Sequence, residues 1–349
     1  MNMKKMTSKE RELAMLAGEK PDRVPVFELN AIVGAQVMGY EWKDVRFDGK
    51  LTSKLVKEFA RMTGTDIVHT WIETNSMFLD FPGMEVKLSD NNYSNVISHY
   101  FNEPEDVDNK PMHDPANRKE SEWLWKGVLD KTKNLVGKDN EYMVEQWSWS
   151  VMSAAGFLRN VEALLMDVLL EPDIAHKVLA KSAVFVDGII RAGIDLGADV
   201  ALLPDPTSSG SLIDGDTLRK FITPHLKKMI GNYEKEFGVP SYIHVCGESE
   251  PVAEAVAELG AKLFSFDYMV NIKELRRLMG DKIILAGNLD PMNIVWMGTP
   301  EMVMEGSKKI IEDAEGKPFV LATGCETPRD APLVNLQAMT AAADKYGKY

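Results

Sequence analysis

Short apolar runs alternate with longer segments of helical period along most of the chain. The apolar runs are rich in β-branched residues and are bounded by turn residues, which is typical of parallel strands joined by crossover helices. They predict eight strands, at 24–29, 66–71, 142–147, 199–204, 241–246, 262–267, 282–287 and 318–323. This alternation predicts an α/β fold, a (β/α)8 TIM barrel.

Amphipathic segments between these runs predict the crossover helices, at 51–63, 161–170, 173–196, 216–237, 250–259, 272–279 and 300–314. Several begin with helix-start residues, such as Thr299 followed by Pro300. Others are followed by glycine, as at Gly238 and Gly280, where a left-handed residue often ends a helix. These signals support one repeated αβ unit.

Residues 82–140 exceed what a minimal barrel needs. Two short apolar runs, 84–88 and 96–101, flank the polar stretch 89–92, which predicts an inserted β-hairpin. The rest of the insertion is expected to cap one end of the barrel, and the chain before the barrel to add an N-terminal helical elaboration. Because no linker rich in Pro, Gly or Ser interrupts the chain, residues 1–349 are predicted to form a single domain.

Composition and charge narrow the classes of function. Hydrophobic residues make up 45% of the chain and charged residues 27%, the balance of a folded globular protein. The formal net charge of −13 would repel nucleic-acid phosphates and anionic membrane surfaces, so neither is an expected partner. No apolar run has the length of a signal peptide or a membrane span, so we expect a cytoplasmic protein.

The strongest candidate chemistry lies at the ends of two predicted strands. His244 and Cys246 are two residues apart on one strand, so their side chains point to the same side. Cys325 follows the last strand on the same face of the barrel, where active sites of this fold lie. One imidazole and two thiolates suit a catalytic zinc site with an open position. The alternative is two ordinary cysteines and a histidine bonded to a backbone carbonyl.

Other polar residues also fall at strand ends. Glu145 interrupts an apolar strand, and Asp205 lies between two prolines, so either could serve as an acid or as a fourth ligand, with Glu248 as a competitor. Each could equally be a helix cap or a turn residue. The full set of strand-end candidates is Glu28, Asn30, Glu73, Asn75, Glu145, Gln146, Asp205, Asp267, Asn288 and Asp290.

The chain carries a series of motifs, at 7–11 with 18–25, at 197–199 leading to 205–206, at 244–247, at 286–291 and at 324–328. Together these motifs resemble the uroporphyrinogen decarboxylase superfamily, and more narrowly its zinc-containing, corrinoid-dependent methyltransferase branch. The resemblance covers essentially the whole chain and keeps the motif order. The decarboxylases hold their acidic tetrapyrrole with N-terminal arginines, whereas 26–34 contains none, so the methyltransferase branch is the better match.

The resemblance implies an enzyme that moves a methyl group between a small methylated substrate and the cobalt of a corrinoid. His244, Cys246 and Cys325 would bind Zn2+, and Glu145 and Asp205 are the catalytic candidates. Because the chain lacks a D-x-H-x-x-G segment, the cobalamin would be carried by a partner protein over the barrel mouth. The candidate substrate-binding residues are Glu28, Asn30, Glu73, Trp147, Asp267 and Asn288.

The methyl donor and acceptor stay open at this point. Residues 30–40 resemble donor-side demethylating enzymes somewhat more than the coenzyme M group, and the aromatic residues near the first strand ends would suit a methoxyaromatic O-demethylase. The alternatives are a methylcorrinoid:thiol (coenzyme M-like) or tetrahydrofolate methyltransferase, a uroporphyrinogen decarboxylase, and a non-catalytic barrel that binds a corrinoid partner. The oligomeric state, with a homodimer among the options, is also open.

Overall fold

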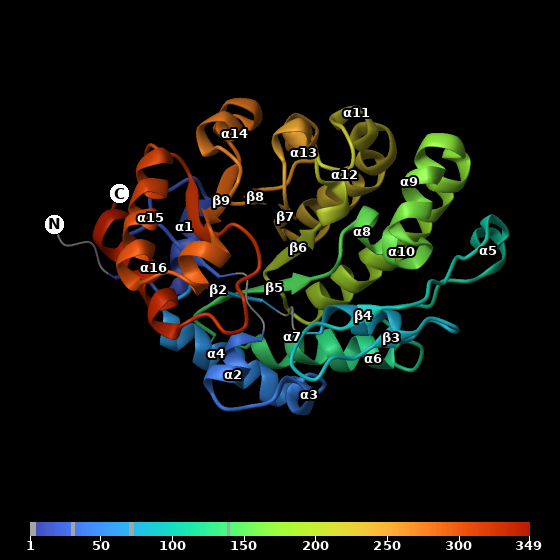
Figure 1. Ribbon diagram of the computed structural model, residues 1–349, viewed down its shortest axis with the longest axis horizontal. Helices are drawn as coiled ribbons and strands as arrows, with labels where there is room; N and C mark the ends of the chain where they lie inside the picture. Colours follow the sequence, from blue (N-terminus) through green and yellow to red (C-terminus); the bar gives the residue numbers. More distant parts are fainter. Residues whose placement is uncertain (1–4, 29–31, 70–72, 138–139) are drawn as a thin grey trace.

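The computed structural model describes residues 5–28, 32–69, 73–137 and 140–349. Eight parallel strands form its central sheet, in the order β1-β10-β9-β8-β7-β6-β5-β2 (Figure 1). They are β1 (Val26–Phe27), β2 (Ile67–His69), β5 (Met143–Trp147), β6 (Val200–Pro204), β7 (Ser241–Val245), β8 (Leu263–Phe266), β9 (Ile284–Leu289) and β10 (Phe319–Thr323). All eight predicted strands are present within a few residues of their expected bounds.

The two outer strands of that order, β1 and β2, meet and close the sheet. The Asp66 N–H, just before β2, donates to the Val26 carbonyl at 2.8 Å, and an Asp66 carboxylate oxygen accepts from the Val26 N–H at 2.7 Å. The strands therefore follow one another in chain order around a ring. The (β/α)8 barrel predicted from the sequence is confirmed.

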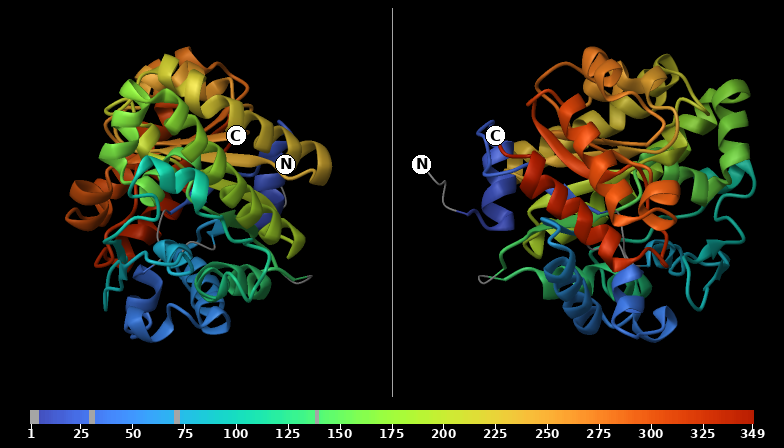
Figure 2. Two further views of the ribbon diagram at one scale, coloured as in Figure 1. Left: turned by 90° about the vertical axis from the view of Figure 1, so that its right-hand side faces the viewer. Right: turned by 60° about the vertical axis from the view of Figure 1, so that its left-hand side comes forward.

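Helices surround the strands, with α2 to α4 on one side of the barrel and α13 and α14 on the opposite side (Figures 1 and 2). Those before β5 are α1 (Ser8–Leu16), α2 (Val33–Val37), α3 (Trp42–Val45), α4 (Gly49–Thr63), η1 (Thr74–Phe78), α5 (Pro104–Asn109), α6 (Glu122–Leu124), η2 (Trp125–Leu129) and α7 (Asp130–Leu135). Those between β5 and β7 are α8 (Val151–Arg159), α9 (Val161–Leu170), α10 (Pro172–Asp195), η3 (Pro206–Ser208), α11 (Gly215–Thr217), η4 (Leu218–Ile222), α12 (Thr223–Asn232) and η5 (Tyr233–Phe237). The remaining ones are η6 (Glu250–Val252), α13 (Ala253–Ala257), α14 (Ile272–Met279), η7 (Pro291–Trp296), α15 (Pro300–Asp313) and α16 (Leu333–Tyr346).

The insertion contains the expected hairpin in shorter form. β3 (Val86–Lys87) and β4 (Asn95–Val96) pair antiparallel, so the connection between them is longer than the predicted turn. The chain after β4 lies against α8, because the Tyr100 and Phe101 N–H groups both donate to the Leu158 carbonyl. This part of the insertion therefore packs against the carboxyl-terminal end of α8, the first helix after β5.

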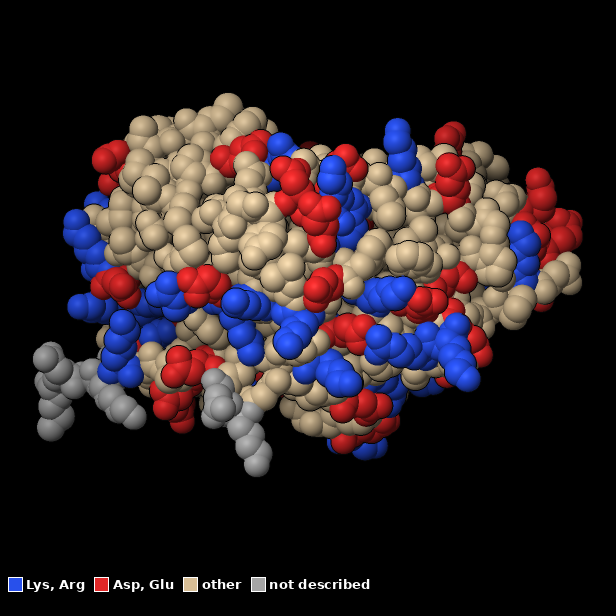
Figure 3. Space-filling view, turned by 90° about the horizontal axis from the view of Figure 1, so that it is seen from below, with Lys and Arg blue, Asp and Glu red and all other residues tan. Residues whose placement is uncertain are grey.

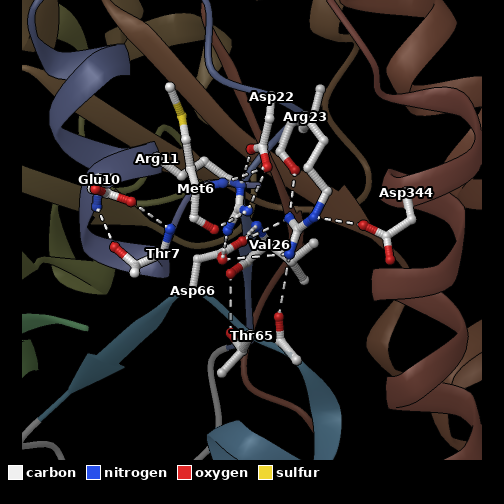
Figure 4. Close-up of polar contacts among 12 residues, drawn as sticks. Met6, Thr7, Glu10, Arg11, Asp22, Arg23, Val26, Thr65, Asp66 and Asp344 are labelled. Carbon is white, nitrogen blue, oxygen red and sulfur yellow. Dashed lines mark hydrogen bonds and ion pairs between the residues drawn. The ribbon is translucent and has the colours of Figure 1, made fainter. Parts of the chain in front are cut away.

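A buried ion cluster ties the N-terminal helix to the point where the barrel closes (Figure 4). Arg11 of α1 contacts Asp66 at 2.5 Å and Asp22 at 2.7 Å, and Arg23 contacts the other Asp66 oxygen at 2.7 Å. The Asp66 side chain has no exposed surface. Two guanidinium groups therefore compensate the charge of one carboxylate that also accepts from the backbone at the start of β1.

No helix in the described part of the chain is both long and apolar enough to cross a membrane.

Candidate metal centre

His244, Cys246 and Cys325 meet at the carboxyl ends of β7 and β10. His244 lies near the end of β7, Cys246 directly follows that strand, and Cys325 is the second residue after β10. The His244 Nε2 atom is 3.0 Å from the Cys246 sulfur, which is 3.3 Å from the Cys325 sulfur. Each of these three side chains offers one possible ligand atom, and the three atoms lie within 4.8 Å of one another. The sequence-predicted ligands therefore come together without a carboxylate.

The two sulfurs share a hydrogen bond that makes them chemically unequal. It lowers the pKa of the Cys325 thiol and raises that of Cys246, with burial raising the pKa of Cys246 further. His244 adds a second hydrogen bond that lowers the pKa of Cys325. A thiolate next to an imidazole and a second sulfur is a ligand set that attracts a soft divalent cation.

Side chains of β8 and its following loop surround these ligands. The hydroxyl of Ser265 is 2.9 Å from Nδ1 of His244, on the side of the ring away from the sulfurs. Asp267 accepts from the N–H of Gly247, the residue after Cys246, at 2.7 Å. Burial raises the pKa of Asp267, and the charge of Cys325 adds to this effect. Strand alternation could have placed Ser265 on the inner face, but only the register of β7 and β8 pairs it with His244.

Glu145 lies away from the metal ligands. It is in the middle of β5, paired in register with His69 and Val200, and the carboxyl group of Glu12 on the N-terminal helix acts on it electrostatically. Burial raises the pKa of its carboxyl well above the usual range, and Glu12 raises it further. Strand alternation fixes the face of a side chain but not its height in the barrel, so the sequence could not place Glu145 relative to the metal ligands, and its role as an acid or as a fourth ligand stays a prediction.

Asp205 caps a helix. Its carboxylate accepts from the Ser153 N–H at 2.8 Å, the Ser153 hydroxyl at 2.7 Å and the Met152 N–H at 3.3 Å. These N–H groups belong to the first turn of α8, whose own N-cap residue, Ser150, makes no side-chain cap. Asp205, directly after β6, therefore accepts from unpaired N–H groups at the start of the helix that follows the adjacent strand β5. The sequence had left open that Asp205 is a helix cap, and its contacts are those of a cap.

The predicted substrate residues divide into loop-holding and core side chains. Asn288 donates to the Asp267 and Val270 carbonyls at 3.0 and 2.8 Å, and so fixes the loop after β8. Glu73 accepts from Trp42 and Arg46, both at 3.2 Å, beneath the surface. Trp147 is fully buried and packs edge-on against Trp149.

The remaining candidates lie apart from the sulfurs or outside the described residues. Glu28 lines a cavity against α4, where burial raises the pKa of its carboxyl to about 8. Asp290 caps η7, and Glu248 is exposed. Asn30 lies outside the described residues. The remaining strand-end candidates, Asn75 and Gln146, bond Trp149 and Thr132.

A groove is lined on one side by residues 326–330, which follow Cys325 in the chain. It has a volume of about 390 Å³ and runs between the loop after β10, η7 and the inserted hairpin. Met292 and Trp296 supply apolar surface, and Glu326 and Arg329 supply polar groups. Sequence reasoning missed this space because its walls come from distant segments. Its volume and its mixed apolar and polar lining suit a small molecule.

Comparison with known proteins agrees with this architecture. The uroporphyrinogen decarboxylase (URO-D) family model matches residues 7–346. Methylcobamide:CoM methyltransferase MtbA of Methanosarcina mazei is 26% identical over 348 residues, covering 99% of each chain. A methylated-thiol–coenzyme M methyltransferase of the same organism is 24% identical, covering 97% of this chain and 89% of its own. A solved methyltransferase structure from Methanosarcina mazei has a TM-score of 0.85 at 23% identity, covering 98% of this chain and 99% of its own. Given the match of the family model to nearly all of its length, the chain belongs to the uroporphyrinogen decarboxylase family.

Proposed function

We propose that this protein is a zinc-dependent methyltransferase that moves a methyl group between a small methylated substrate and the cobalt of a corrinoid protein. The observation that carries the proposal is the meeting of His244, Cys246 and Cys325 at the carboxyl ends of the barrel strands. A decarboxylase of the same family would have no need for this ligand set. The relatives with full-length matches named as methylcobamide or methylated-thiol methyltransferases point to the same branch.

The donor set fits zinc. A tetrahedral zinc ion keeps its nitrogen and sulfur ligands roughly 3.5–3.8 Å apart. The observed separations of 3.0 and 3.3 Å are slightly shorter, so small outward shifts of the side chains would admit the ion. A bound zinc ion would act as a Lewis acid that activates a thiol or the heteroatom bearing the methyl group. His244, Cys246 and Cys325 would hold the ion as its protein ligands.

The chain's own residues would position the substrate and limit its approach. The groove lined by residues 326–330 would hold the body of the substrate between Trp296 and Met292, with Arg329 at its polar side. Hydrogen bonds of Asp267 and Asn288 hold the loop after β8, which would keep this part of the mouth in one shape. The catalytic roles of Glu145 and Asp205 remain predictions, and their contacts suit support of the barrel better than contact with substrate.

The direction of transfer has a second candidate. Relatives named for coenzyme M favour a methylcorrinoid:thiol reaction, in which the thiol rather than a methyl ether would occupy the open metal position. The same metal centre serves both directions, because a thiolate and an ether oxygen each bind through one heteroatom. A spectroscopic screen of methyl-cobalt formation and loss, with methoxyaromatics, methylamines, methanol, coenzyme M and tetrahydrofolate, separates the two.

Metal analysis of the purified protein tests the proposal first. We expect about one zinc per chain, and its loss in Cys246→Ser and in Cys325→Ser, because each removes one of three ligands. Ser241→Ala, a change in a buried serine of β7 outside the ligand group, is the matched control and should retain the metal. Full methyl-cobalt chemistry in a cysteine variant that holds no zinc would overturn the proposal.

A further inference from the structure

Strand β8 supplies none of the three ligands, but it contacts the first of them directly. Ser265 is paired in register with His244 on β7, so the two side chains lie side by side on the inner face. The Ser265 hydroxyl has no exposed surface and is 2.9 Å from His244 Nδ1. This contact leaves Nε2 of the same ring directed at the Cys246 sulfur, 3.0 Å away. The hydroxyl therefore fixes the rotation of the imidazole.

The loop after β8 holds the backbone next to the second ligand. Asp267 accepts from the Gly247 N–H with one carboxylate oxygen and from the Tyr268 N–H with the other, both at 2.7 Å. Gly247 follows Cys246 and has a φ of +70°, in the region that favours glycine. The carboxylate thus ties the turn that ends β7 to the turn that ends β8. The direction of the Cys246 side chain depends on this turn.

The same loop sets how close the third ligand comes. A Cβ atom on Gly324 would lie 2.3 Å from the Tyr268 backbone nitrogen, so only glycine allows the chain before Cys325 to pass there. From the other side, Asn288 of β9 holds the loop through the Asp267 and Val270 carbonyls. The loop is therefore a fixed surface against which the Cys325 turn packs.

We propose that β8 and the loop 267–270 determine the positions of all three metal ligands, with Ser265 as the positioning residue for His244 and Asp267 as that for Cys246. The inference rests on the proposed metal centre but concerns how its ligands are held. A metal-bound histidine carries its proton on the other ring nitrogen and needs an acceptor there, which the Ser265 oxygen provides. Loss of such a partner typically weakens metal binding by roughly 10–100-fold.

Ser265→Ala tests the inference, with Ser241→Ala as its matched control. Ser241 is a similarly buried serine on β7, and its hydroxyl has no hydrogen-bond partner in the described part of the chain. We expect Ser265→Ala to weaken zinc binding, measured against a competing chelator, by roughly 10–100-fold. Ser265→Thr, which keeps the hydroxyl, should recover most of the affinity. Equal zinc affinity of Ser265→Ala and Ser241→Ala would overturn the inference.

A measurement without metal separates this inference from the proposed function. In metal-free protein, nitrogen NMR of the His244 ring should report a changed tautomer or ring environment in Ser265→Ala and no change in Ser241→Ala. If the wild-type protein bound no zinc but this difference persisted, the proposed function would fail while the positioning role stood. An unchanged His244 spectrum in Ser265→Ala would reject the positioning role whatever the metal content.

Discussion

Glu12 and Glu28 are carboxyl groups removed from solvent at two points of the barrel. Burial raises the pKa of each to about 8, and the nearby charge of Asp66 acts in the same direction. Glu12 lies within 3.4 Å of the Tyr242 hydroxyl, inside the strands, whereas Glu28 faces α4. At neutral pH both carboxyls are therefore largely protonated in the folded protein, although both would be ionised in the unfolded chain.

This difference predicts a stability that falls as pH rises. Above the unfolded pKa near 4.5 and up to about 8, the folded state holds protons that the unfolded state has released, so the free energy of unfolding decreases with pH. Glu28→Gln removes one such proton, and we expect its loss of stability between pH 5 and pH 8.5 to be smaller than that of the wild type by at least ~1 kcal/mol. Urea denaturation at both pH values measures the free energy of unfolding.

Glu19→Gln changes an exposed carboxyl and should have the wild-type pH dependence of stability. A Glu28→Gln variant with the full wild-type pH dependence would contradict the conclusion that Glu28 is protonated in the folded protein.

The contacts of Asp205 predict a structural phenotype. Asp205→Ala leaves the first turn of α8 without its cap and the Ser153 hydroxyl without an acceptor, so we expect a loss of roughly 1–3 kcal/mol in the free energy of unfolding. Asp205→Asn keeps an acceptor oxygen and should lose less. Metal content should stay at the wild-type level in both. A stable Asp205→Asn protein with its methyl transfer abolished would instead support the catalytic role expected from the sequence.

At the residue scale, the sequence revealed the groups whose chemistry is distinctive by itself. His244, Cys246 and Cys325 stood out because imidazole and thiol groups at strand ends have few other common uses. Ser265 could not stand out, because a serine in a strand has no distinctive signal until its neighbour is known. Asp205 was visible as an acid, but its partner, the start of α8, comes from a segment some fifty residues earlier.

At the element scale, the N-terminal helix and the start of β2 depend on one carboxylate (Figure 4). Asp66 bonds Arg11 and Arg23 and the Val26 N–H, with no exposed surface. Asp66→Ala would leave two buried guanidinium groups short of a partner, so we expect a loss of roughly 3–5 kcal/mol in the free energy of unfolding. Asp344→Ala is the matched control, because it removes another Arg23 contact from a carboxylate that is 60% exposed. A loss below ~1 kcal/mol in Asp66→Ala would show that the cluster does not hold the closure together.

The elements that the sequence located well are those with a clear burial pattern. Strands of the barrel are buried on both faces and read as continuous apolar runs, and α14 has an apolar stripe that fixed its bounds. In contrast, eight of the nine residues of α8 are buried, so it has no polar face to reveal a helical period, and it was not predicted. The hairpin pairs only two residues on each strand, which left its turn length undetermined by pattern. The single-domain reading of residues 1–349 stays a prediction.

At the scale of the whole molecule, charged side chains of both signs are interspersed over the face shown in Figure 3. Exposed charges of the molecule also form ion pairs, for example Arg118 with Asp130 at 2.6 Å and Arg61 with Glu58 at 2.7 Å. The barrel mouth differs from this face because it exposes apolar side chains. Exposed apolar side chains follow β6, β8 and β9 on the same edge as the metal ligands, and they are Leu212, Tyr268, Met269 and Met292. A rim of this kind suits contact with another protein surface.

If a corrinoid protein docks over this rim, a charge placed there should weaken docking without altering the metal centre. Leu212 is 48% exposed between η3 and α11, outside the loop 267–270, and its side chain is not a candidate ligand. We expect Leu212→Lys to reduce methyl transfer with the protein-bound corrinoid by about tenfold or more, through the cost of burying a lysine, and to leave transfer with free cobalamin nearly unchanged. Leu13→Lys, at a side chain 49% exposed on α1, is the matched control away from the mouth and should behave as the wild type in both assays. Equal losses with free and protein-bound corrinoid in Leu212→Lys would mean that the substitution acts on the metal centre itself and that the partner docks elsewhere.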